Sequence, residues 1–231
     1  MLTTFKTTLS EKKQLVNNVY LFTFKLVSPG EIDFQAGQYL MLKVPKDGSF
    51  VSRLYSIASS PSIRDSFELI IEIIPGGLAS TLLDHLQVGQ EIEFQGPAGL
   101  FTAKDQARKK IFLITGTGIA PVRAMLKSGL NNFELFWGLK TFKDVYLFEE
   151  MKQFNPKICL SRETDLLTIG EEDRKYFDLG HVNDCFQKSS GLESNRDTEF
   201  YLCGSRINVE SLRLYLLGKN VPQENIRFEK F

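Results

Sequence analysis

The periodicity of apolar residues along this chain changes near residue 101. Before that point apolar and polar residues alternate with a period of two, and glycine or proline interrupts almost every gap between these segments. After it, short continuous apolar runs alternate with segments of helical periodicity. Alternation is typical of half-buried antiparallel strands, whereas apolar runs between helices are typical of a parallel sheet. The sequence therefore predicts two domains.

The first half predicts a small antiparallel structure. Strands are expected over residues 19–26, 39–44, 53–58, 67–74 and 91–94. A helix is expected over residues 80–86, because its leucines fall on one face. Several short strands with regular turns favour an antiparallel barrel or a sandwich.

The second half predicts an α/β domain. Strands are expected over residues 111–114, 133–137, 158–160, 200–203 and 226–228, and helices over residues 121–127, 144–153, 182–188 and 208–217. Strand and helix in alternation imply right-handed crossovers and a parallel five-stranded sheet. The boundary is expected near residues 101–108, which divides the chain into domains 1–103 and 104–231.

Composition excludes several classes of protein. The chain of 231 residues has 28 basic and 28 acidic side chains, so it lacks the basic excess of a nucleic-acid binder. Three scattered cysteines (Cys159, Cys185, Cys203) and two histidines predict neither a disulfide framework nor a metal site. The chain shows no signal peptide and no apolar run of membrane-spanning length. We expect a cytoplasmic protein without a membrane span.

A glycine turn directly follows the first strand expected in the second half. Gly116 and Gly118 permit a tight turn and a close approach of a ligand, and Pro121 suits the first position of a helix. The amides at such a helix start attract phosphate. Pro121 stands where the usual dinucleotide fingerprint has a third glycine, and the next strand ends at Lys140 rather than at an acidic ribose contact. The motif itself is equally compatible with a turn that binds nothing.

Five motifs occur in a characteristic order along the chain. They are Arg53-Leu54-Tyr55-Ser56, Pro75 to Thr81, Gly116 to Pro121, Cys203-Gly204-Ser205 and the ending Phe228 to Phe231. In this order the sequence resembles the ferredoxin–NADP reductase superfamily over nearly its whole length, and most of all the flavoprotein reductase components of oxygenases. The resemblance implies an FAD-binding antiparallel β-barrel followed by a nucleotide-binding α/β domain.

The resemblance assigns FAD to the first half. It implies that the Arg53 guanidinium neutralises the pyrophosphate, that the Tyr55 ring lies on the isoalloxazine, and that Ser56 hydrogen-bonds flavin N5. The further contacts it implies are Leu54, Ile71, Ile73, Gly77, Leu78, Ala79, Ser80 and Thr81. Alternatives remain: the Arg53 motif also fits an ordinary edge strand, Ser80 also fits a helix N-cap, and the side chains of Ile71 and Ile73 also fit the core.

The resemblance assigns a pyridine nucleotide to the second half. The contacts it implies are Gly116, Thr117, Gly118, Pro121, Ser161, Arg162, Cys203 and Gly204. Thr117 and Cys203 are expected beside the nicotinamide, although a lone cysteine after an apolar strand is more often simply buried. Ser161 and Arg162 are expected to grip a 2′-phosphate, which favours NADPH while leaving NADH open. Nearby His181 fits the start of a surface helix better than a phosphate contact.

The end of the chain is the last candidate. By resemblance, Phe231 covers the flavin face that nicotinamide must reach, moving aside in turnover, and Glu229 lines the site. The alternative is that Phe228 and Phe231 pack the last strand. Together with Ser56 and Cys203, Glu229 and Phe231 are the residues expected nearest the reacting atoms.

The expected function is that of an FAD-dependent oxidoreductase. Hydride would pass from NADPH, or NADH, to FAD, and single electrons would then pass to a separate acceptor protein such as a ferredoxin, a flavodoxin or an oxygenase component. The sequence lacks a cysteine-rich cluster, so any iron–sulfur centre is expected on another protein. Alternatives are an NAD(P)H:flavin reductase, an electron-transfer flavin subunit of a larger complex, and a nucleotide-binding module without turnover.

Overall fold

The computed structural model describes residues 2–103, 107–189 and 197–231. They form two compact units, Met1–Ala103 with Ala120–Gly129, and Lys104–Ile119 with Leu130–Phe231. Residues 104–106, within the expected boundary, lie outside the described part. The domain limits 1–103 and 104–231 stay a prediction, and helix α2 (Ile119–Lys127) groups mostly with the first unit.

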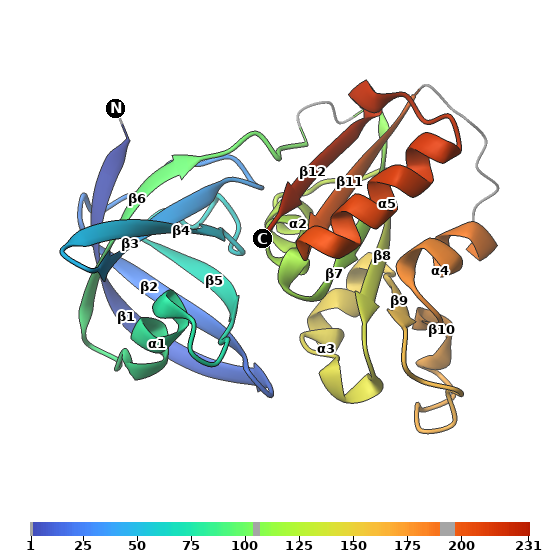
Figure 1. Ribbon diagram of the computed structural model, residues 1–231, viewed down its shortest axis with the longest axis horizontal. Coiled ribbons are helices and arrows are strands. Elements are labelled where there is room, and N and C mark those ends of the chain that lie inside the picture. Colours follow the sequence, from blue (N-terminus) through green and yellow to red (C-terminus); the bar gives the residue numbers. More distant parts are fainter. Residues whose placement is uncertain (1, 104–106, 190–196) are drawn as a thin grey trace. The chain divides into compact units, whose positions relative to one another are not determined.

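The first unit contains a six-stranded antiparallel sheet (Figure 1). The strands lie in the order β4-β3-β6-β1-β2-β5. Their bounds are β1 Thr3–Val16, β2 Val19–Ser28, β3 Tyr39–Lys46, β4 Ser49–Ser56, β5 Ser66–Glu72 and β6 Glu91–Ala98. Edge strands β4 and β5 meet where Ile57 pairs with Leu69, and this bridge closes the sheet into the expected barrel.

Strand β1 is the element of this unit that the sequence analysis missed. It pairs with both β2 and β6, yet only Phe5, Thr7 and Leu9 along it are buried. One of these three is polar, and the Thr7 hydroxyl is satisfied by donating to the Ile92 carbonyl at 2.8 Å. A strand whose alternation depends on a threonine carries a weak hydrophobic signal.

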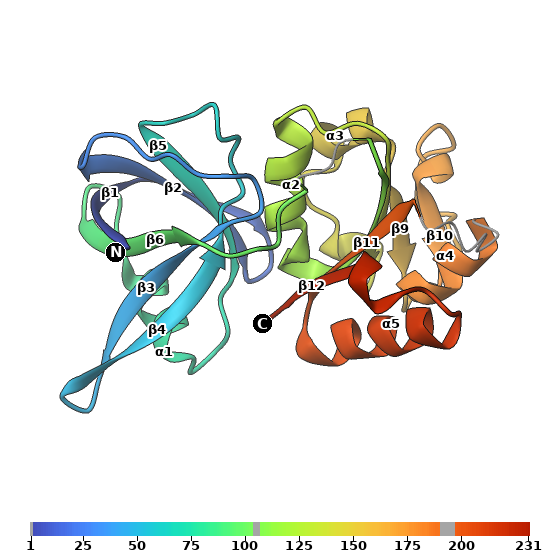
Figure 2. The ribbon, with the colours of Figure 1, turned by 90° about the horizontal axis from the view of Figure 1, so that it is seen from above.

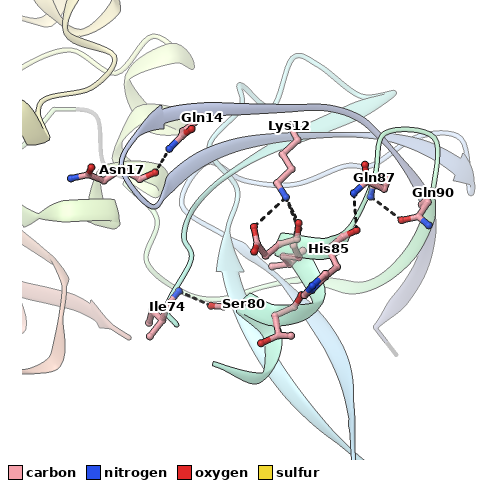
Figure 3. A network of polar contacts seen from close by, with 11 residues as sticks. Lys12, Gln14, Asn17, Ile74, Ser80, His85, Gln87 and Gln90 are labelled. Carbon is pink, nitrogen blue, oxygen red and sulfur yellow. Dashed lines mark hydrogen bonds and ion pairs between the residues drawn. The ribbon is translucent and has the colours of Figure 1, made fainter. Parts of the chain in front are cut away.

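Helix α1 (Leu78–His85) packs Ala79 and Leu83 against the core of the barrel. The helix expected over residues 80–86 is thus present and begins two residues earlier than expected. Its last turn is held by Lys12 of β1, whose ammonium donates to the carbonyls of Leu83 and Asp84 (Figure 3). A cation at this end is favoured by the helix dipole.

A cluster of aromatic rings occupies the middle of this core. Phe24 is fully buried and lies 5.4 Å from Phe67 and 5.0 Å from Phe94, measured between ring centroids. We expect Phe24→Ala to lower the free energy of unfolding by about 3–5 kcal/mol, because it removes this packing and leaves a cavity. Chemical denaturation measures the loss. Phe50→Ala is the control, because Phe50 on β4 is 67% exposed; an equal loss in both variants would contradict the prediction.

The second unit contains a parallel sheet with the order β10-β9-β8-β7-β11-β12. The bounds are β7 Lys109–Thr115, β8 Phe133–Leu139, β9 Lys157–Leu160, β10 Phe177–Leu179, β11 Thr198–Gly204 and β12 Ile226–Lys230. The expected sheet had five strands, and this count was wrong. The additional strand, β10, has three residues and is too short to show a periodicity in the sequence.

Helices cover both faces of this sheet. Helices α4 (Val182–Ser189) and α5 (Arg206–Gly218) contribute to the same apolar core, and Figure 2 shows α3 (Phe148–Met151) on the face opposite α5. The helix expected over residues 144–153 was wrong in length. Leu147 adopts a left-handed φ of +54°, which prevents a continuous helix before α3.

The order of the strands reverses at β7. After β7 the chain adds β8, β9 and β10 on one side, and it then returns to place β11 and β12 on the other. In open α/β sheets, ligands bind beyond the carboxyl ends of the strands at such a reversal. The glycine turn follows β7 directly, so it stands at the position where a ligand is expected. Among the described helices, none is long and apolar enough to cross a membrane.

Candidate functional site

The first candidate motif forms the end of strand β4. Tyr55 pairs with Leu40 of β3, and Ser56 pairs with Tyr39. Arg53 and Leu54 are exposed, whereas Tyr55 and Ser56 are half-buried. Tyr55 packs against the barrel core, and burial raises its pKa to about 12. The phenol therefore stays neutral and offers a flat ring at the edge of the barrel.

The start of helix α1 presents backbone amides, from Leu78 to Ser80, that have no hydrogen-bond partner among the residues that the structure describes. Gly77 is the N-cap and no side chain caps it, because the Ser80 hydroxyl instead accepts from the Ile74 amide at 3.0 Å (Figure 3). The alternative that Ser80 caps this helix was therefore wrong. The first amide that donates a hydrogen bond within the helix is that of Thr81, which reaches the Gly77 carbonyl at 2.8 Å. Amides at such an unfilled start suit a pyrophosphate.

Two isoleucines precede this helix start. Ile71 on β5 is 3% exposed, and Ile73 is half-buried and packs against the same core as Tyr55 and Leu78. Their side chains therefore stabilise the barrel, so any contact with a ligand depends on their backbone. The core thus brings the ring of Tyr55, the segment ending at Ile73 and the start of α1 into one cluster.

The glycine turn of the second unit is a single 3₁₀ turn over Gly116–Gly118. Gly116 has a φ of +53° and open space where a side chain would stand. Its carbonyl accepts hydrogen bonds from Trp137 Nε1 and from the Tyr146 hydroxyl, both at 3.0 Å. Because these two rings are buried and meet edge to face, they hold the turn in one conformation.

Sequence reasoning did not identify Trp137 and Tyr146 as part of the site. Trp137 lies on β8 and Tyr146 follows the next turn, so neither is near Gly116 in the sequence. The one available signal is that Trp137 is the only tryptophan of the chain and lies in a strand expected beside the turn. Buried indole and phenol groups need hydrogen-bond acceptors, and the turn supplies one carbonyl for both.

Pro121 lies two residues further along than expected. Helix α2 begins at Ile119, so Pro121 is its third residue rather than its first. The position is tolerated because the amides of the whole first turn lack partners within the helix, and proline therefore removes no helical hydrogen bond there. Pro121 is buried, so its ring serves packing.

Strand β11 ends against the glycine turn. A Cβ added to Gly118 would lie 2.5 Å from the Cys203 carbonyl oxygen, and one added to Gly204 would lie 2.1 Å from Thr115 Oγ1. Glycine is required at both positions by this close approach. The structure thus places Cys203 and Gly204 directly beside the turn. Their contact with a nicotinamide stays a prediction.

The chain end joins the same edge of the sheet. Cys203 pairs with Glu229 of β12, and the Phe231 amide donates to the Gly204 carbonyl at 3.2 Å. The Phe228 ring is 43% exposed and the Phe231 ring 56% exposed. The Phe228 ring lies against Arg213 and Lys230, whereas Phe231 is the more exposed of the two. Phe231 is accessible at the carboxyl edge of β11 and β12.

The Cys203 thiol is fully buried. Burial and the neighbouring Glu229 carboxylate raise its pKa well above the ordinary value. Because the thiolate is the nucleophile, we expect iodoacetamide to leave Cys203 unmodified from about pH 6 to about pH 9 in the folded protein. Peptide mass spectrometry checks this, with the chain unfolded in urea as the control. Rapid alkylation of Cys203 in the folded state would contradict it.

The raised pKa of Cys203 also determines how the free energy of unfolding depends on pH. A thiol whose pKa is higher in the folded than in the unfolded state makes its full contribution to the free energy of unfolding at low pH. That contribution is lost as the pH rises above the ordinary thiol pKa, because the unfolded chain then ionises first.

The candidate phosphate contacts lie where β9 ends. The Ser161 hydroxyl donates to the Leu139 carbonyl at 3.2 Å, and the Arg162 amide donates to the Lys140 carbonyl at 2.8 Å. The exposed Arg162 guanidinium makes no hydrogen bond or ion pair with any residue that the structure describes. It is therefore available to an anion, whereas the Ser161 hydroxyl already uses its proton.

His181 begins helix α4. It is exposed, its carbonyl accepts from the amides of Asp184 and Cys185, and its own amide donates to the Asp184 carboxylate at 3.2 Å. This is the surface helix start that the sequence analysis favoured. Cys159 and Cys185 are free and buried in the second core.

These geometries define a protein with two nucleotide-type sites. One is a barrel whose core packs both the Tyr55 ring and the uncapped start of α1, and the other is an open glycine turn at the reversal point of a parallel sheet. The arrangement fits a flavin and a pyridine nucleotide, because both carry a pyrophosphate that backbone amides bind.

Comparison with known proteins agrees with this class. Residues 6–103 match the family model of the oxidoreductase FAD-binding domain, and residues 112–212 match that of the oxidoreductase NAD-binding domain. The chain belongs to the ferredoxin–NADP reductase superfamily and contains an FAD-binding and a pyridine-nucleotide-binding domain.

Three relatives illustrate the likeness. The reductase component of propane 2-monooxygenase from Mycolicibacterium smegmatis is 32% identical over 222 residues, which cover 90% of this chain and 62% of that protein. Ferredoxin–NADP reductase B from Sorangium cellulosum is 27% identical, covering 86% and 85%. The crystal structure of the Amycolatopsis cytochrome P450 reductase superposes with a TM-score of 0.85 at 24% identity, covering 100% and 70%. This chain thus spans less than two thirds of the monooxygenase reductase.

Proposed function

We propose that this chain is an FAD-dependent oxidoreductase that takes hydride from NADPH and passes electrons singly to a separate acceptor protein. The observation that carries the proposal is the presence of two pyrophosphate-type sites on one chain. One is the uncapped start of α1, which packs on the same core as Tyr55, and the other is the open turn at Gly116. The match to an FAD-binding and an NAD-binding domain supports the same assignment.

The residues of the first unit fit the flavin nucleotide. The amides from Leu78 to Ser80 and the exposed Arg53 guanidinium would bind its pyrophosphate, since both are donors suited to an anion. The Gly77 amide already donates to the Ile74 carbonyl at 2.9 Å. The neutral Tyr55 ring would pack on the flavin, with the Ser56 hydroxyl at the adjoining position of the strand. Bound there, FAD would supply the capacity to take two electrons as hydride and to give them up one at a time.

The residues of the second unit fit the reduced nucleotide. The turn Gly116–Gly118 would hold the pyrophosphate, while Thr117 would approach the nicotinamide. Arg162 would pair with the 2′-phosphate, which favours NADPH over NADH, because a guanidinium fork matches phosphate oxygens. The neutral, buried Cys203 would line the nicotinamide pocket without adding charge, and Glu229 would supply the carboxylate beside it.

The acceptor is proposed from the relatives. Among them are reductase components of a propane monooxygenase and of a glycine betaine monooxygenase, an electron-transfer component of a toluate dioxygenase, and a ferredoxin–NADP reductase. We propose an oxygenase component, a ferredoxin or a flavodoxin as acceptor. The exposed Phe231 would cover the flavin in the absence of nicotinamide and move aside for it.

The test is anaerobic mixing of the FAD-loaded protein with NADPH and, separately, with NADH. We expect the flavin absorbance to bleach with NADPH faster than with NADH. A flavin that stays oxidised with both nucleotides would contradict the enzyme. Gel filtration separates this function from a flavin reductase, because a yellow colour that stays with the protein shows retained FAD, whereas a colourless protein favours release of reduced free flavin.

A further inference from the structure

Helix α2 carries a buried arginine that none of the proposed contacts uses. Arg123 is 2% exposed and belongs to the first unit together with the barrel. Its Nη1 donates to the Glu68 carboxylate at 2.6 Å and to the Ala58 carbonyl at 2.8 Å. The arginine therefore joins α2 to strand β5 and to the segment that follows strand β4.

The two acceptors of Arg123 lie at the seam where the barrel closes. The Ala58 amide donates to the Glu68 carbonyl at 2.8 Å, and the Glu68 amide donates to Ser59 Oγ at 3.1 Å. Ile57 forms the bridge to β5 next to them. Arg123 thus closes a ring of hydrogen bonds whose first member is only two residues after Ser56.

The hydrogen bonds of Arg123 to Ala58 and Glu68 form a clamp between α2 and the barrel. Burying its charged groups costs desolvation free energy that packing alone would not require. A buried guanidinium must be fully paired, and an apolar side chain would pack a helix against a barrel without that requirement. A charged pair instead demands one geometry, because its hydrogen bonds are directional. This geometry constrains the position of the Ala58 carbonyl, and the constraint limits how the end of β4 can move.

We propose that Arg123 is a positioning residue for the flavin site. By holding the Ala58 carbonyl and the Glu68 carboxylate together, it sets the place of the Ser56 hydroxyl at the end of β4. The inference rests on the proposed function, since Ser56 is taken there as a contact of the bound flavin. Arg123 itself touches neither flavin nor nucleotide in this scheme and acts through the backbone of residues 56–58.

The test compares three variants of the full chain loaded with FAD. Arg123→Met removes the hydrogen bonds to Ala58 and Glu68, Arg123→Lys keeps the charge, and Glu68→Gln keeps the shape but removes the carboxylate. We expect Arg123→Met and Glu68→Gln to slow flavin reduction by NADPH about tenfold or more at saturating nucleotide, and to shift the flavin absorption bands. Arg123→Lys is expected to recover part of the rate.

Ser60→Ala is the matched control. The Ser60 hydroxyl donates to the Lys127 carbonyl at 3.4 Å, so this variant weakens another contact of α2 with the barrel and leaves the clamp intact. We expect it to lower the melting temperature slightly while leaving the flavin spectrum and the reduction rate unchanged. If Arg123→Met does not fold, Glu68→Gln decides the question.

One outcome overturns the inference and spares the proposed function. Arg123→Met and Glu68→Gln would melt at lower temperature, yet their flavin spectra and their rates of reduction by NADPH would equal those of the wild type. Arg123 would then only dock the helix. A wild-type chain that binds no FAD would contradict the proposed function first, and this inference with it.

Discussion

Replacing Ser56 with alanine is expected to slow reduction of the bound flavin by about 10²-fold. Ser56 is half-buried at the last position of β4, where it pairs with Tyr39. Its hydroxyl is proposed to bond the atom of the flavin that accepts hydride, and a donor positioned where charge develops acts mainly on the transition state. We therefore expect the limiting rate to fall while FAD stays bound. Stopped-flow absorbance with excess NADPH measures it.

Two further variants make this result specific. Ser56→Thr keeps the hydroxyl and is expected to recover most of the rate. Ser52→Ala removes a hydroxyl from an exposed position of the same strand, where Ser52 pairs with Lys43, and is expected to change nothing. Equal rates for the wild type and Ser56→Ala, with FAD bound in both, would rule out this role of the hydroxyl.

Replacing Arg162 with methionine is expected to reverse the preference between the two nucleotides. The Arg162 guanidinium is exposed at the end of β9 and has no partner among the residues that the structure describes. Losing a charge-assisted contact to the 2′-phosphate should lower kcat/KM for NADPH by about ten- to a hundredfold. NADH lacks that phosphate, so its kcat/KM should be unchanged. Steady-state kinetics with both nucleotides measures the two values.

Arg64→Met is the control for this prediction. Arg64 is an exposed arginine of the first unit that pairs with Glu31 at 3.2 Å, so its loss removes the same charge far along the chain. We expect both kinetic values to stay unchanged in it. A parallel loss for NADPH and NADH in Arg162→Met would show that Arg162 does not read the phosphate.

Much of the candidate site was accessible to sequence reasoning because its motifs are local. A pair of glycines after an apolar strand predicts a tight turn, and the structure has that turn at Gly116–Gly118. Cys203 lies beside this turn, since parallel strands end at one edge of a sheet, while its expected contact with the nicotinamide stays a prediction. The residues that support these motifs were missed. Trp137, Tyr146 and Arg123 act on backbone carbonyls of segments distant in the sequence.

The errors in secondary structure have the same origin. Strand β1 buries a threonine among its few inward residues, and β10 has three residues, so both depend on neighbouring strands rather than on their own pattern. The expected helix over residues 144–153 had a suitable periodicity, yet Leu147 takes a left-handed conformation. The secondary-structure propensity of a short segment is weak compared with the packing that a whole unit imposes on it.

Two rhythms of hydrophobicity, a set of turns and five ordered motifs were enough to indicate a barrel, a parallel sheet and the superfamily. These properties follow from residues close together in the chain, because side-chain period and turn chemistry are local. Only the tertiary structure determined three pairings. The Trp137 indole donates to the Gly116 carbonyl, Cys203 pairs with Glu229 on the neighbouring strand, and Arg123 pairs with Glu68. Such pairings arise only when strands and helices distant in the sequence become neighbours, and no local pattern encodes that distance.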